Sequence, residues 1–288
     1  MTSRNVTQQY PALRDDIADL STRRPLPGPG LEQLDPFLFL NHHGPQVYPP
    51  ANQGLPFGPH PHRGFETITF ILTGELAHLD SGGHESVIRA GGVQWMTAGA
   101  GVVHAELSPA SFKHAGGPLE ILQLWLNLPG KLKMTAPAYT GLQADAIPVL
   151  QLDQGRARVH LVSGEVAGQR GPFQSLTDTC LMSVQLSAGA EIELPAPLGR
   201  QVFLYVVDGD QVSVAGTALN AQHLVALDDS HAGVRLTSQG DATLLYGHAA
   251  PLNEPVVSYG PFVMNTQEEI RQAVVDYRAG KFGEVPGH

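Results

Sequence analysis

The stretch that decides the fold is GPHPHRGFETITFILTGELAHL, residues 58–79. From Phe65 to Leu72 its side chains alternate between two faces with a period of two, which predicts a β-strand and not a helix. Gly74 interrupts this strand, the pattern resumes in ELAHLD, and DSGGH at residues 80–84 is typical of a hairpin turn. This part of the chain is therefore expected to form short strands joined by tight turns.

The same rhythm of strands and turns occurs twice along the chain. A further strand is predicted at residues 120–129, and residues 130–150 have the composition of a linker. A second set of short strands follows from residue 157, separated by glycine and aspartate turns, which favours a sandwich or a barrel. We expect an all-β protein with two tandem barrels, divided into residues 1–135, 136–250 and 251–288.

The third part is expected to contain a closing helix in NTQEEIRQAVVDYRAG, residues 265–280. Thr266 and Glu269 have the spacing of a capping box at the start of a helix, and Gly280 is a suitable stop. The predicted apolar face follows the i, i+3, i+4, i+7 pattern and consists of Ile270, Ala273, Val274 and Tyr277.

Composition excludes several classes of function. Hydrophobic residues make up 42% and charged residues 15%, which is enough apolar material for a core. The net charge of −10 and the absence of a basic stripe argue against direct binding to nucleic acids. The single cysteine, Cys180, cannot form an internal disulfide, and no apolar run suggests a signal peptide or a membrane span. We expect a cytoplasmic monomer.

Two histidine-containing pairs suggest a metal site. Residues i and i+2 of a strand point to the same side, so His60 can face the same way as His62, and His104 the same way as Glu106. Pro61 stiffens the first pair, and its missing N–H places that segment at a strand start or a barrel rim.

Three imidazoles and one carboxylate suit iron, manganese, cobalt, nickel, copper or zinc, and they differ from the thiolates of a closed structural zinc site. Vacant positions on such an ion could accept an oxygen-donor substrate and dioxygen. The alternative is that these are unrelated surface residues, because a chain with 13 histidines contains some H-x-H pairs by chance.

The glycine framing of these residues resembles the cupin pattern, G-x5-H-x-H-x3-E followed by G-x2-H. Gly54, Glu66 and Gly101 stand at the corresponding positions. The match departs from the usual spacing at Gly74, which lies one residue late, and Ser108 replaces the usual asparagine. In many cupins the first-motif glutamate is the fourth ligand, so on spacing alone Glu66 competes with Glu106.

A narrower resemblance is to the pirin family of bicupins. It rests on HPHRGFETITFILTGELAHLDSGG, GGVQWMTAGAGVVHAEL, LQLWLNLPGKLKMTAPAY and GPFVMNTQEEIRQAVVDYRAGKFG, and it spans nearly the whole chain. The resemblance implies two jelly-roll barrels that face each other, closed by a C-terminal helix. It implies an Fe(II)-type site in the first barrel with His60, His62, His104 and Glu106 as ligands, no metal in the second barrel, and a supporting role for Glu66.

The remaining histidines receive other interpretations. His42 and His43 lie in a turn-rich segment and are expected at the surface, while His78 and His84 flank a hairpin tip and are expected to be exposed. His160, His223, His231 and His248 are scattered, with no partner at a useful spacing.

The resemblance implies two alternative functions. Some bacterial pirin-like proteins resemble quercetin 2,3-dioxygenases. In that case the metal would polarise a flavonol hydroxyl, Glu106 would serve as catalytic base, and ring cleavage by dioxygen would release carbon monoxide. The pocket could be lined by Phe57, Phe65, Trp95 and Met96. The alternative is a non-enzymatic, redox-sensitive regulator that binds a protein partner. A dioxygenase for another phenol is also consistent with the sequence.

Overall fold

The alternating stretch that begins at Phe65 forms strand β6 (Phe65–Thr73), which lies inside a seven-stranded sheet. The structure, a computed structural model, describes residues 3–287. Strand β6 pairs with a neighbour along each edge. Its first seven residues are buried, and since their side chains alternate between the two faces, both faces of the strand are covered. The chain forms two compact units, described here separately: unit 1 (residues 3–13, 24–36 and 145–251) and unit 2 (residues 14–23, 37–144 and 252–287).

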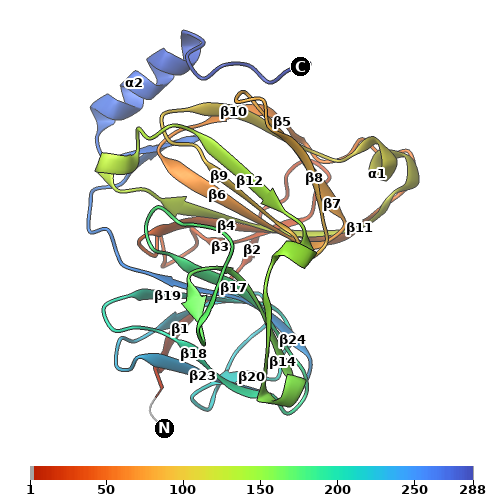
Figure 1. The fold of residues 1–288 in the computed structure, drawn as a ribbon, viewed down its shortest axis with the longest axis vertical. Coiled ribbons are helices and arrows are strands. Elements are labelled where there is room, and N and C mark those ends of the chain that lie inside the picture. The colour runs from red at the N-terminus through yellow and green to blue at the C-terminus, as the bar shows by residue number, and fades with distance from the viewer. Residues whose placement is uncertain (1–2, 288) are drawn as a thin grey trace. The chain divides into compact units, whose positions relative to one another are not determined.

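Unit 2 contains a seven-stranded and a four-stranded antiparallel sheet that share one apolar core (Figure 1). Ile71 and Ile121 come from the larger sheet, and Leu76 and Ile88 come from the smaller one. The larger sheet has the order β12 (Ala138–Leu142), β9 (Val93–Thr97), β6, β11 (Gly117–Asn127), β4 (Phe37–Tyr48), β3 (Thr22–Leu26) and β2 (Leu13–Arg14). The smaller has the order β5 (Phe57–His62), β10 (Val102–Leu107), β7 (Glu75–Asp80) and β8 (Glu85–Arg89).

Unit 1 repeats this arrangement, again with a core built from both sheets, as Val184 and Leu244 meet Leu194 and Leu236. The larger sheet has the order β1 (Val6–Pro11), β22 (His223–Leu227), β19 (Gln201–Asp208), β24 (Ala242–Ala249), β17 (Cys180–Leu186), β14 (Ala157–Ser163) and β13 (Val149–Leu152). The smaller has the order β18 (Glu191–Pro195), β23 (Gly233–Ser238), β20 (Val212–Val214) and β21 (Thr217–Ala218), and β15 (Glu165–Val166) pairs with β16 (Gln169–Arg170). The expected all-β fold is therefore confirmed.

The predicted closing helix is α2 (Gln267–Arg278), shown in blue in Figure 1, and it follows a ribbon of β25 (Val257–Tyr259) and β26 (Phe262–Met264). Its capping box is present: the Thr266 side chain accepts from the Glu269 backbone N–H, and the Glu269 side chain accepts from the Thr266 backbone N–H. A short helix that the sequence did not predict, α1 (Ala110–Ala115), buries Phe112. Neither helix among the described residues is long and apolar enough to cross a membrane.

The observed units differ from the expected domains 1–135, 136–250 and 251–288. Strand β1 pairs with β22 in unit 1, so the first strand of the chain is not part of the first barrel. Residues 130–150, expected to be a linker, contain β12, which pairs with β9 and forms an edge of the large sheet of unit 2. The tail from residue 252 also belongs to unit 2.

Candidate metal centre

The two predicted histidine pairs lie on adjacent antiparallel strands of the smaller sheet of unit 2. His60 and His62 lie in the last three residues of β5, and His104 lies in β10, where it pairs directly with His60. Between the pairs His104–His60 and Glu106–Phe57, strand β5 contains one extra residue, so the ladder is irregular there. Proline at positions 59 and 61 is compatible with this, since proline donates no ladder hydrogen bond.

The three imidazoles converge. One ring nitrogen from each of His60, His62 and His104 lies within 4.8 Å of the other two. Their ring centroids are 4.4 Å apart for His60 and His104, 4.9 Å for His60 and His62, and 5.0 Å for His62 and His104. No other such cluster of three metal-ligating side chains occurs among residues 3–287.

Burial favours the uncharged form of two of these rings, His62 and His104. Burial, reinforced by the neighbouring His60, lowers the pKa of His62 to about 3, and burial together with His62 and His60 holds the pKa of His104 well below its usual range. His104 is only 1% exposed, yet neither of its ring nitrogens has a hydrogen-bond partner. Because a buried unpaired polar group costs free energy, this ring fits a metal ligand better than a structural histidine.

The orientation of two rings is fixed by backbone carbonyls. The Nδ1–H of His60 donates to the Gly58 carbonyl at 2.8 Å, and the Nδ1–H of His62 donates to the Pro261 carbonyl at 3.3 Å. A carbonyl can only accept, so Nδ1 carries a proton in both rings, and the neutral form of each ring has its lone pair on Nε2. Histidines that bind metals commonly make such a bond with their second nitrogen.

Glu106 lies on the same strand as His104 and is 4% exposed, but it is not part of the three-histidine cluster. Gln123 Nε2 donates to both of its carboxylate oxygens, at 2.9 and 2.8 Å, and Thr69 Oγ1 donates to one at 3.3 Å. Gln123 and Thr69 were not predicted as site residues. Strand periodicity alone could have identified them, because it predicts which residues of β11 and β6 share a face of the sheet.

Glu66, the competing carboxylate, is also buried, and Thr97 Oγ1 donates to its Oε1 at 2.7 Å. Burial raises its pKa, although hydrogen bonds from Thr97 and Trp95 oppose this. Glu66 is likewise not part of the histidine cluster.

Aromatic rings surround the histidine cluster on the side of β11. Trp125 lies 5.2 Å from the His62 ring and 4.4 Å from Phe65, and Phe39 stacks on Trp125 at 4.5 Å. Phe65, one of the predicted lining residues, contacts His62 at 5.1 Å, whereas Phe57 contacts His43. Trp125 is therefore a neighbour of the site that the sequence did not single out. Met96, also predicted to line the pocket, instead packs in the small cluster that contains Ala98 and Val102.

The prediction that His42, His43 and His78 are exposed is wrong, because each is buried with a polar partner. The Nε2–H of His42 donates to Glu120 Oε1 at 2.9 Å, and His43 Nδ1 is hydrogen-bonded to Thr22 Oγ1 at 2.8 Å.

His78 points into the unit instead of projecting from the hairpin tip. Its Nε2–H donates to Asp80 at 3.0 Å, and its ring stacks on Tyr139 at 3.8 Å. The His78 ring is 5.4 Å from His104 and so borders the metal centre. The side chain of His84 is half exposed and donates to the same Asp80.

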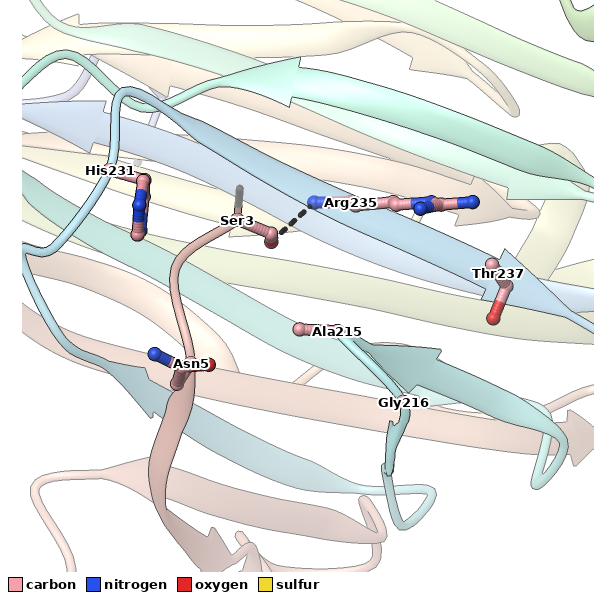
Figure 2. A pocket seen from close by; sticks show the side chains of 7 residues that line it. All are labelled: Ser3, Asn5, Ala215, Gly216, His231, Arg235 and Thr237. Atoms are coloured by element: carbon pink, nitrogen blue, oxygen red, sulfur yellow. Dashed lines mark hydrogen bonds between the residues drawn. The ribbon is translucent and has the colours of Figure 1, made fainter. Parts of the chain in front are cut away.

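A surface pocket in unit 1 provides a contrast (Figure 2). Its volume is about 520 Å³, and its polar groups already bond to the protein. The backbone N–H of Arg235 donates to Ser3 Oγ at 2.9 Å, the Arg235 guanidinium pairs with Glu191, and Asn5 Nδ2 donates to Asp228. The unpartnered nitrogens of His104 therefore make the metal centre the stronger candidate site.

Comparisons with known proteins agree with this architecture. The family model "Pirin" matches residues 19–126, and the model "Pirin C-terminal cupin domain" matches residues 181–283. Human pirin is 37% identical over 270 residues, which cover 91% of this chain and 87% of that protein.

Two solved structures have the same fold. The quercetin 2,3-dioxygenase of Acinetobacter baumannii is 34% identical, with a TM-score of 0.92 over 98% of this chain and 99% of that one. The bacterial pirin YhhW of Escherichia coli, solved in complex with nickel(II), is 20% identical, with a TM-score of 0.67 over 85% of this chain and 99% of that one. On these matches and the two-unit β architecture, the chain belongs to the pirin family.

Proposed function

We propose that this protein is a metal-dependent dioxygenase that opens the ring of a flavonol such as quercetin. The observation that carries the proposal is the convergence of His60, His62 and His104, in which the buried His104 has two unpartnered nitrogens. Support for the substrate class comes from the 34% identical relative that bears the name quercetin 2,3-dioxygenase.

The proposed ligands are Nε2 of His60, Nε2 of His62, a ring nitrogen of His104 and the carboxylate of Glu106. Neutral imidazoles with one carboxylate suit a divalent first-row metal, and we propose Fe(II), with manganese, cobalt, nickel, copper and zinc as other metals that the set can hold. When bound, the metal supplies a Lewis acid that lowers the pKa of a flavonol hydroxyl.

In this proposal Glu106 is also the catalytic base. Its carboxylate accepts the proton of the flavonol hydroxyl, and the Gln123 amide, which now donates to both oxygens, keeps it in place. Trp125 lies beside His62 and stacks on Phe39, and these two partly exposed rings provide apolar surface suited to a planar substrate. Reaction of the flavonolate with dioxygen then cleaves the ring and releases carbon monoxide.

The test is to load the protein anaerobically with Fe(II), add quercetin in air, and follow the loss of flavonol absorbance together with carbon monoxide release. We expect turnover by the wild type, none by His62→Ala, and a large decrease for Glu106→Gln, since the amide is a poor base. His231→Ala, which removes a partly exposed histidine of unit 1, is the matched control and should retain full activity.

Two outcomes would contradict the proposal. If iron-loaded wild type leaves a panel of flavonols unchanged, the dioxygenase function is wrong, and the metal-dependent protein-interaction alternative is favoured. If His62→Ala turns over quercetin at the wild-type rate, the histidine cluster is not the reaction centre.

A further inference from the structure

The C-terminal segment, residues 261–282, contacts the strand that supplies two of the histidines. The Pro261 carbonyl accepts the His62 Nδ1–H at 3.3 Å, and the same carbonyl accepts the Arg63 backbone N–H at 3.3 Å. The Val263 backbone N–H donates to the Arg63 carbonyl at 3.0 Å, so residues 262 and 63 form a parallel bridge. The segment therefore holds the backbone next to His62 as well as its ring.

A buried ion pair fixes the same position from helix α2. Arg63 Nη1 donates to Asp276 Oδ2 at 2.9 Å, and both residues are less than 10% exposed. Arg63 Nε donates to the Ala100 carbonyl at 2.7 Å, and its guanidinium lies 4.6 Å from the Phe282 ring centroid. With the planar group engaged on three sides, Arg63 has little freedom to move.

Asp276 is equally constrained. Its Oδ1 accepts from Gln272 Nε2 at 2.9 Å and from Lys281 Nζ at 2.7 Å. Asp276 occupies a position of α2 that the sequence pattern did not assign to the apolar face, and the partner that accounts for its burial is Arg63. Removing the Asp276 carboxylate would leave the buried Arg63 guanidinium without its anionic partner, whereas Asp276 has a second cation in Lys281.

The segment also contacts the second ligand strand. Phe282 packs against Gly101, where an added Cβ would lie 2.5 Å from the ring. Ser81 Oγ donates to the Phe282 carbonyl at 2.6 Å and accepts from the backbone N–H of Val103, the residue before His104, at 3.1 Å. One continuous segment therefore joins the residue after His62 to the residue before His104.

We propose that Asp276 and Phe282 are positioning residues of the metal centre. Through Arg63 and the Pro261 carbonyl, the C-terminal segment holds His62 with Nε2 free, and through Phe282 it sets the position of β10 relative to β5. The three imidazoles are thereby arranged for a metal before it arrives. This inference rests on the metal centre of the proposed function and adds a part of the chain that lies about 155 residues or more from the ligands in sequence.

The test is metal affinity, measured with Co(II) against a chelator in full-length protein, with the visible spectrum of bound Co(II) as a report on ligand geometry. Asp276→Asn should bind Co(II) about tenfold more weakly, the usual cost of losing a group that orients a ligand. Phe282→Ala should weaken binding too. The matched control is Glu268→Gln, which breaks an exposed ion pair with Arg271 on the same helix and should leave affinity unchanged.

Measurements are made at a temperature where circular dichroism shows each metal-free variant to be folded, so that affinity is separated from stability. Wild-type affinity and an unchanged Co(II) spectrum in both Asp276→Asn and Phe282→Ala would overturn the positioning role while leaving the metal centre intact. Failure of the wild type itself to bind Co(II) would instead contradict the metal centre, and this inference with it.

Discussion

His104 offers a test in which one substitution changes stability in opposite directions with and without metal. Its ring is 1% exposed and both of its nitrogens lack partners, and leaving a buried polar group unsatisfied costs about 1–3 kcal/mol. Leucine has a similar volume and no polar atoms. In metal-free protein, His104→Leu should therefore increase the free energy of unfolding by about 1–3 kcal/mol.

With metal the order should reverse. A ligand present at roughly 1,000 times its dissociation constant stabilises the folded state by about 4.1 kcal/mol, which exceeds the advantage of the variant. His104→Leu should gain little of this because one of the three imidazoles is missing. The assay is urea unfolding of both proteins after chelator treatment and again with added Co(II). We expect the variant to be more stable in the first condition and the wild type to be more stable in the second.

His78→Leu is the matched control, since His78 is a buried histidine only 5.4 Å from the His104 ring that does have partners. Removing its bond to Asp80 and its stacking on Tyr139 should destabilise the protein in both conditions. The reasoning is refuted if metal-free His104→Leu unfolds at lower urea than the wild type, because the unpaired ring would then not be a cost to folding.

Two further predictions concern neighbouring positions. Gly101→Ala should destabilise the protein by about 2–4 kcal/mol, since Gly101 has φ +132° and an added Cβ would meet the Phe282 ring. The control is Gly83→Ala, at φ +85° with open space around it, which should lower the free energy of unfolding in urea by less. Equal decreases for the two variants would contradict the steric argument. Burial lowers the pKa of Lys133 to about 8 from 10.5, so the unfolded state binds more protons between pH 8 and 10.5 and this residue's contribution to stability rises with pH there. Lys133→Met should remove that rise. If the free energy of unfolding of the variant depends on pH as it does in the wild type, the lowered pKa of Lys133 is wrong.

Features that depend on local pattern were predictable from the sequence. The period-two alternation after Phe65 predicted β6, and the spacing of Thr266 and Glu269 predicted the capped start of α2. The convergence of His60, His62 and His104 followed from the i, i+2 rule together with the family resemblance. These predictions are confirmed because the geometry of a strand or a helix is set by residues only a few positions apart.

Burial that depends on distant partners was not predictable. The turn-forming letters NHHGP suggested a surface loop, but β4 runs through them to Tyr48, and His42 finds its partner 78 residues away at Glu120. Likewise Asp276 occupies a buried position only because Arg63 lies opposite. Helix α1 is six residues long, which is too short for a periodic signal.

The strand pairing of β1 has a consequence for how the protein is made. Its partner β22 lies more than 200 residues later in the chain, and the helix that packs beside the histidine strands is the last one synthesised. All strands of the two sheets of unit 2 come from residues 13–142, but the large sheet of unit 1 is complete only once β24 has been made. The Pro261 carbonyl that orients His62 is made later still. Strand β1 lacks its partner until β22 has been made, and the final arrangement of the histidine centre is a late event in the biosynthesis of this chain.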